Sequence, residues 1–280
     1  MKVTYLNHSG FLVEWEHCFW LFDYYKGNIP ELDRTKHIFV FCSHSHGDHF
    51  NPAVFALAME YPSVTYVFSN QVRRAYRKLQ RDPRGIRLSQ AQYGRVCGME
   101  NECGEVQIPD DTEAAEKGTV TVPIPEVLFL PVRTDTVLRD GSGNDISVHT
   151  LQSTDCGCAF VVRYMGKTVY HAGDLHWWSW PGESEAWNRK MTSDYQKEIQ
   201  YLENQNIDLA FTPLDPRQES AYACGMNYLL KKVRIRDVFP MHFWDSFDVI
   251  DRYLRENSVP EGTTLHRLVR DGQSVSVAED

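Results

Sequence analysis

The chain has 280 residues, of which 42% are hydrophobic and 12% aromatic, so a disordered polypeptide is excluded. Its net charge of −9 argues against a general affinity for nucleic acid. No apolar run is long enough to cross a bilayer, and the N-terminus lacks the apolar stretch of a signal peptide. Seven cysteines, an odd number without a secretion signal, favour reduced thiols. We therefore expect a cytoplasmic protein that does not enter a membrane.

Apolar runs bounded by turn residues predict five strands in the first seventy residues. These strands are expected at Val3–Leu6, Phe11–Glu14, Trp20–Asp23, Ile38–Cys42 and Val64–Phe68. Asn51-Pro52 predicts the start of a helix that continues to about Glu60. Asn70 is expected to cap a basic helix that ends near Gln80.

Residues 81–120 lack a clear period and are rich in glycine, proline and acidic residues, so they predict an irregular insertion with at most short strands. Strands then resume. They are expected at Val120–Val122, Val127–Leu130, Ile146–Leu151, Ala159–Tyr164 and Thr168–Tyr170.

The second half of the chain is richer in helical patterns. Helices are expected at Ser184–Asn206, Glu219–Lys232 and Phe247–Glu256, with strands at Leu209–Thr212 and Val238–Met241. Thr264–Val269 and Ser274–Val277 predict a closing hairpin around Asp271-Gly272. This order favours two packed sheets with helices outside, in one domain over residues 1–280.

The motif His44-Ser45-His46-Gly47-Asp48-His49 follows directly after a predicted buried strand. It places four metal-competent side chains within six residues, and a loop at a strand end can turn them inward together. Imidazole and carboxylate ligands suit zinc, iron or manganese. A histidine-rich surface loop is the alternative, but the tight spacing favours a metal site.

This motif resembles the signature of the metallo-β-lactamase superfamily. Tyr170-His171-Ala172-Gly173-Asp174 and Phe239-Pro240-Met241-His242 also end apolar strands, in the order which that family shows. The opening Asn7-His8-Ser9-Gly10-Phe11 is similar to the branch that contains ascorbate-phosphate lactonase. The resemblance implies a four-layer αββα sandwich with the site along one edge of the two sheets.

The resemblance also implies a set of metal ligands. His44 and His46 would hold the first ion, Asp48, His49 and His242 the second, and Asp174 would bridge them. The family supplies a third histidine to the first ion, but the corresponding segment here, Gln152 to Gly157, contains none. Asp155 is favoured as its replacement, with His149 as the alternative; a weak or absent first ion is the third possibility.

Further residues are candidates for roles beside the metals. Asp48 is placed to orient or deprotonate the nucleophile, and His8 and His176 flank family motifs as candidate proton donors or substrate-binding groups. Trp178 belongs to a tryptophan cluster that either walls a pocket or packs in the core. Arg217 either binds an anion or, as we favour, forms an ordinary salt bridge.

The favoured hypothesis is a hydrolase that uses two divalent ions, zinc first and manganese or iron as alternatives. Its substrate would be a small ester, lactone or phosphorylated metabolite. A nuclease or phosphodiesterase, a di-iron redox protein and a non-catalytic metal-binding protein are the other classes that stay open. We expect a small-molecule substrate and no nucleic-acid partner, and an oligomer is possible.

Overall fold

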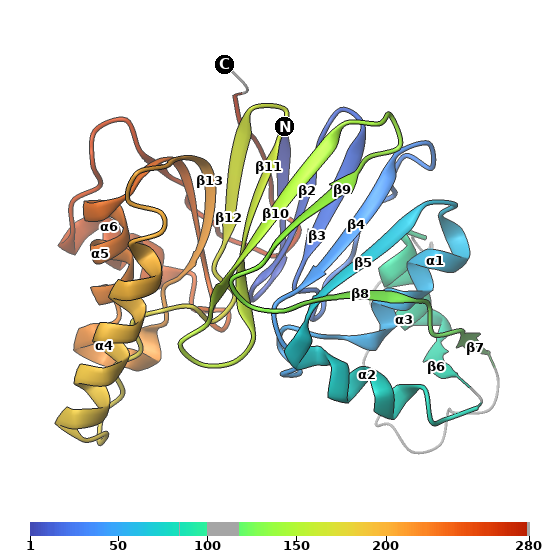
Figure 1. Cartoon of the computed structure of the whole chain (residues 1–280), viewed down its shortest axis with the longest axis horizontal. Coiled ribbons are helices and arrows are strands. Elements are labelled where there is room, and N and C mark those ends of the chain that lie inside the picture. The colour runs from blue at the N-terminus through green and yellow to red at the C-terminus, as the bar shows by residue number, and fades with distance from the viewer. Residues whose placement is uncertain (84, 100–117, 279–280) are drawn as a thin grey trace.

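The computed structural model describes residues 1–83, 85–99 and 118–278, and two seven-stranded sheets lie face to face at its centre (Figure 1). In order across it, the first sheet contains β16 (Ser274–Ser276), β1 (Lys2–Asn7), β2 (Gly10–Glu14), β3 (Cys18–Phe22), β4 (His37–Cys42), β5 (Val64–Ser69) and β8 (Val127–Leu130). Strands β3, β4, β5 and β8 run parallel to one another. Because β3 and the part of β4 after His37 are buried on both faces, they are continuously apolar rather than alternating.

The second sheet has the same size and a similar division into antiparallel and parallel halves. In order across it, it contains β15 (Thr264–Leu265), β14 (Arg234–Met241), β13 (Asn206–Pro213), β12 (Lys167–His171), β11 (Cys158–Tyr164), β10 (Asp145–Gln152) and β9 (Asp135–Arg139). The strands from β9 to β12 pair antiparallel, and those from β12 to β15 pair parallel.

Helices cover the outer face of each sheet (Figure 1). Beside the first sheet lie α1 (Leu57–Glu60), α2 (Arg73–Leu79) and α3 (Gln90–Cys97), and beside the second lie α4 (Glu185–Ile199), α5 (Cys224–Lys232) and α6 (Asp248–Glu256). Short 3-10 turns occur at η1 (Pro52–Ala56), η2 (Asn70–Val72) and η3 (Pro216–Ala221). The four-layer αββα sandwich expected from the resemblance is therefore confirmed.

Aromatic side chains fill the space between the sheets. The rings of Phe11 on β2 and Phe211 on β13 lie 4.2 Å apart, and those of Phe22 and Phe211 lie 6.0 Å apart. A second apolar cluster, which includes Phe55 and Phe68, lies between the first sheet and its helices. Burial of these rings contributes the largest stabilising free energy to the sandwich. Because the rings hold the two sheets against each other, they also hold together the edge where the strands of both sheets end.

The predicted closing hairpin is wrong. Thr264–Leu265 pairs parallel with β14 in the second sheet, whereas Ser274–Ser276 pairs antiparallel with β1 in the first. The two segments therefore cross from one sheet to the other instead of pairing. Asn70 is not a helix cap either, because Ser69 precedes the turn and the Asn70 side chain accepts a hydrogen bond from Arg73 Nε.

The predicted insertion at 81–120 is partly regular. Short strands are present, since β6 (Ile86–Ser89) pairs antiparallel with β7 (Thr119–Val122). Between them, helix α3 begins with a capping box in which Ser89 and Gln92 exchange hydrogen bonds with the backbone, a signal that the sequence contained. Residues 84 and 100–117 of the insertion lie outside the described part of the chain.

Other features of the described chain also bear on what the sequence predicted. Strand β9 was not predicted, and helix α4 ends at Ile199, before the expected Asn206. The six cysteines in the described ranges are free thiols. Within those ranges, no helix is both long and apolar enough to span a bilayer.

Candidate metal centre

The candidate centre lies where strands of both sheets end. Strand β4 leads into the His44–His49 motif, β12 leads into Asp174, and β14 leads into His242. The turn between β1 and β2 adds His8. Because neighbouring parallel strands end at one edge, groups far apart in the sequence meet there.

Three histidines direct the same ring nitrogen at Asp174. The Nε2 atoms of His44, His49 and His242 lie 3.2, 3.1 and 3.4 Å from the Asp174 carboxylate. Asp174 is buried, and within the described part of the chain neither its Oδ1 atom nor His49 Nε2 has a hydrogen-bond partner. Unpartnered buried polar atoms are costly unless another group satisfies them. A cation among these atoms would do so, so the residues fit a metal ion.

The opposite nitrogen of each of these rings is held from behind by a hydroxyl or a carboxylate. The distances are 3.0 Å from His44 Nδ1 to Ser43 Oγ, 2.8 Å from His49 Nδ1 to Asp23 Oδ2, and 3.0 Å from His242 Nδ1 to Asp215 Oδ2. Such contacts fix the tautomer and orientation of metal-binding imidazoles. The sequence analysis identified none of these three supporting residues.

Asp23 has the largest role among the supporting residues, because it also accepts hydrogen bonds from the Ser43 backbone N–H (2.7 Å) and hydroxyl (2.5 Å). It is fully buried. Burial alone would raise the pKa of its carboxyl, but the His49 hydrogen bond and the nearby His171 and His49 charges outweigh burial and lower it. Asp23 therefore stays ionised behind His49.

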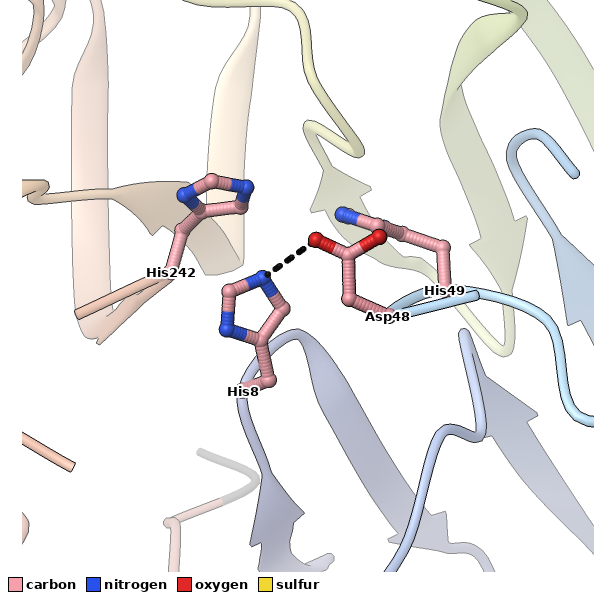
Figure 2. A group of neighbouring side chains, drawn as sticks. All are labelled: His8, Asp48, His49 and His242. Carbon is pink, nitrogen blue, oxygen red and sulfur yellow. Dashed lines mark ion pairs between the residues drawn. The ribbon is translucent and has the colours of Figure 1, made fainter. Parts of the chain in front are cut away.

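One half of the centre groups His8, Asp48, His49 and His242, whose candidate ligand atoms lie within 4.8 Å of one another (Figure 2). His8 Nε2 lies 3.4 Å from Asp48 Oδ2, and its ring centroid lies 4.2 Å from that of His242. His8 is only 2% exposed, and apart from this contact with Asp48 neither ring nitrogen has a hydrogen-bond partner among the described residues. Burial lowers the pKa of His8 to about 4, so the ring is neutral at pH 7. His8 thus lies among the candidate metal ligands, where the sequence analysis had placed only a proton donor or substrate-binding group.

The other half of the centre is more open. His46 Nδ1 lies 3.0 Å from His44 Nε2 and 3.9 Å from Asp155 Oδ2, and the His46 and Asp155 side chains are about half exposed. Asp155 and Cys156 form a group with His46 in which the candidate ligand atoms lie within 4.8 Å. The structure therefore brings Asp155 beside His46, and its role as the third ligand stays a prediction. Cys156 joins this group although it was not among the ligands expected from the sequence.

Comparisons with known proteins support the fold. No family model matches the chain. A UPF0173 metal-dependent hydrolase from Opitutus terrae is 23% identical over 247 residues, which cover 87% of this chain and 85% of that protein. The metallo hydrolase Igni18 from Ignicoccus hospitalis superimposes with a TM-score of 0.54 at 14% identity, covering 98% of this chain and 97% of the other. The metallo-β-lactamase fold protein YhfI from Bacillus subtilis gives the same TM-score and identity, with 98% of each chain covered.

The chain has the metallo-β-lactamase fold and is similar to metal-dependent hydrolases. The three proteins above are not described as lactonases, so the narrower resemblance to the ascorbate-phosphate lactonase branch stays a prediction.

His149, the alternative third ligand in this metallo-β-lactamase-fold protein, lies away from the centre. Its Nδ1 atom pairs with Asp135 at 2.9 Å, and its ring stacks on Tyr201 with centroids 4.1 Å apart. It belongs to none of the candidate metal-binding groups among the described residues. His149 was therefore a wrong candidate, because its place in the middle of β10 directs it to a different part of the second sheet.

The prediction that His176 binds substrate is also not supported. Its ring is fully buried behind the centre, where Nε2 lies 3.1 Å from Gln218 Oε1 and Gly225 packs against the ring. Burial lowers the pKa of His176 to about 4. This neutral ring is a packing group, and it does not line the cavity above the centre.

A cavity of about 240 Å³ opens over the candidate centre and has an aromatic wall. Trp178 lines this cavity, which agrees with the first of the two roles considered for the tryptophan cluster. Its indole Nε1 donates a hydrogen bond to the backbone oxygen of Asp174 at 3.0 Å. Arg217 also lines the cavity but forms a salt bridge with Asp215, the role that the sequence analysis favoured. Asp48 and Asp174 also line the cavity.

Proposed function

We propose that this protein hydrolyses a small ester, lactone or phosphorylated metabolite with two divalent metal ions, of which zinc is favoured and manganese or iron are alternatives. The observation that carries the proposal is the convergence of three imidazole Nε2 atoms on the buried carboxylate of Asp174. A structural ion pair needs one histidine, and three with their opposite nitrogens held from behind are typical of metal ligands.

The described residues fall into two proposed ligand sets that share Asp174. The second set is Asp48, His49, His242 and His8, whose candidate ligand atoms form one group. The first is His44, His46 and Asp155, proposed because His46 groups with Asp155 and, separately, with His44 and Asp48. Bound divalent ions of this kind acidify a water molecule and stabilise negative charge that develops on oxygen.

Asp48 is the proposed proton acceptor and orienting group for the attacking water. Burial alone would raise the pKa of its carboxyl, but the neighbouring His8 and His49 lower it. It is therefore ionised at neutral pH, and it lines the cavity. A carboxylate in that position can accept a hydrogen bond from water and hold it toward a bound substrate.

The cavity also supports a small-molecule substrate, because about 240 Å³ is room for a small organic molecule. We propose a cytoplasmic location on the basis of the free thiols at six cysteines, which suit a reducing compartment.

Metal analysis joined to an activity panel tests the proposed function. Protein reconstituted with zinc, manganese or iron should bind two ions per chain and hydrolyse at least one of a set of carboxylic esters, lactones and phosphate esters. Asp174→Asn should lose bound metal and activity together. Asp135→Asn, which removes an exposed carboxylate far from the centre, is the matched control. Fewer than one ion per chain, or full activity in Asp174→Asn, would overturn the proposal.

The third ligand of the first ion needs its own comparison. Asp155→Ala is expected to lower the stoichiometry from two ions toward one, while His149→Ala should leave it at two. Cys156→Ala separates the carboxylate from the neighbouring thiol. If only Cys156→Ala loses an ion, the thiol is the ligand and the proposed role of Asp155 is wrong.

A further inference from the structure

The wall of the cavity begins with two parallel indole rings. Trp178 and Trp180 stack with centroids 5.4 Å apart and an interplanar angle of 7°. Trp178 is fixed against the centre by its hydrogen bond to the Asp174 backbone, so its N–H is not free for a ligand. The pair therefore presents apolar ring surface beside Asp174.

Helix α4 supplies a second part of the wall. Trp187 and Met191 are four residues apart, so they lie on the same face of the helix, and both line the cavity. The buried residues of α4 are confined to its C-terminal half and are Tyr195, Glu198 and Ile199. The N-terminal half thus holds its largest apolar side chains over the cavity, and a flexible thioether such as Met191 adapts to the outline of a ligand.

Arg217 forms the last part of the cavity wall, but its positive charge is already paired with a carboxylate. Its guanidinium carbon lies 5.4 Å from the Trp180 ring and 5.0 Å from the Trp244 ring. Its Nε atom lies 3.0 and 3.1 Å from the two carboxylate oxygens of Asp215, which is buried. Among the described residues, no other lysine or arginine lines the cavity. A strongly anionic substituent would therefore find no unpaired cationic side chain on this wall.

We propose that the substrate carries an aromatic ring, held by Trp178, Trp180 and Trp187, next to an ester or lactone bond that lies over the metal centre. The size is suitable, because a cavity of roughly 150 Å³ accommodates benzene, and the space here is about 240 Å³. The inference rests on the proposed hydrolase function and narrows its substrate class. In the reaction, a water oxygen bonds to the carbonyl carbon, the ester C–O bond breaks, and a carboxylic acid and an alcohol are released.

Two esters with the same leaving group test the inference. Methyl phenylacetate and methyl acetate both release methanol and differ by one aromatic ring. With the metal-loaded protein, kcat/KM should be at least about tenfold higher for methyl phenylacetate. This ratio should fall toward one in Trp180→Ala and in Trp187→Ala. Trp177→Ala removes a tryptophan that packs against Tyr195 and Tyr228 outside the cavity lining, and it should keep the ratio.

Binding of phenylacetate and acetate, measured by calorimetry, separates this inference from the proposed function. If neither ester is hydrolysed but phenylacetate binds more tightly and Trp180→Ala removes the difference, the aromatic site stands and the hydrolase proposal fails. Hydrolysis of both esters with equal kcat/KM would overturn the aromatic site alone. Faster hydrolysis of a sugar lactone or of a phosphate ester would also overturn it.

Discussion

The carboxylate of Asp23 lies 2.8 Å from Nδ1 of His49, and both side chains are fully buried. Asp23 follows β3 and His49 follows β4, which are neighbouring parallel strands. One strand end therefore provides a candidate ligand, and the adjacent strand end provides the group that orients it. The same carboxylate accepts two hydrogen bonds from Ser43, next to His44.

Asp23→Asn is expected to weaken zinc binding by about 10- to 100-fold, because the neutral amide no longer polarises His49 and can reverse its tautomer. The affinity is measured by competition with a chromophoric chelator. Asp140→Asn is the control, since Asp140 is a buried carboxylate that accepts hydrogen bonds from Tyr164 and Asn144 outside the centre. Equal affinity in Asp23→Asn and the wild type would show that Asp23 only stabilises the fold.

His8→Phe is expected to weaken binding of one of the two ions about tenfold or more, because it removes a donor whose nitrogens are buried and, apart from the contact with Asp48, unpartnered among the described residues. Substitution with cobalt gives a readout independent of activity, since the visible spectrum reports the ligands. The spectrum should change in His8→Phe and stay unchanged in His149→Phe. An unaltered spectrum with reduced turnover would instead favour the original role of His8 as a proton donor.

Gly157→Ala is expected to destabilise the fold by roughly 1–3 kcal/mol or more and to weaken metal binding. Gly157 has a φ of +72°, and an added Cβ would lie 1.9 Å from the Ser43 oxygen and 2.7 Å from His44 Cβ. Gly166→Ala is a matched control, because Gly166 has a φ of +75° with no atom within 4 Å of the added carbon. The free energy of unfolding of both variants, measured with urea, separates the steric clash with Ser43 from the strain of a positive φ. Similar losses in the two would contradict the expectation.

The metal-free protein is expected to lose stability as the pH falls from 7 to 5, with His176 contributing about 2 kcal/mol. Burial lowers the pKa of His176 from 6.5 to about 4, so below pH 6.5 the unfolded chain takes up a proton that the folded chain does not. The contribution is complete above pH 6.5 and is lost down to pH 4. His176→Gln should therefore show a smaller decrease in the free energy of unfolding, measured with urea at both pH values. The more exposed His17→Gln should keep the wild-type decrease, and an unchanged slope in His176→Gln would contradict the assignment.

The sequence predicted those parts of the site that depend on local order. His44 to His49 is compact and follows an apolar strand, so its position could be inferred without the fold. The role of Asp23 could not, because it depends on β3 and β4 being parallel neighbours, and the order of strands in a sheet is not a local property. Cys156 was missed for a related reason, since its approach to His46 comes from a loop of the opposite sheet.

His149 and helix α3 show two other limits of sequence inference. A histidine inside a strand points to one face of the sheet or to the other, according to the register of the strand. In β10, His149 lies on the face that packs against Tyr201. Helix α3, in contrast, was detectable: Ser89 and Gln92 have capping-box spacing, but the surrounding glycines obscured it.

The backbone oxygen of His8 accepts a hydrogen bond from the backbone N–H of His242 at 3.1 Å. These residues belong to different sheets and to opposite ends of the sequence, yet main-chain atoms hold them together. Their ring positions consequently depend on the sandwich itself and not on a shared ligand. The second half of the centre is thus preorganised, so an arriving cation would meet donors whose conformational entropy was already lost during folding.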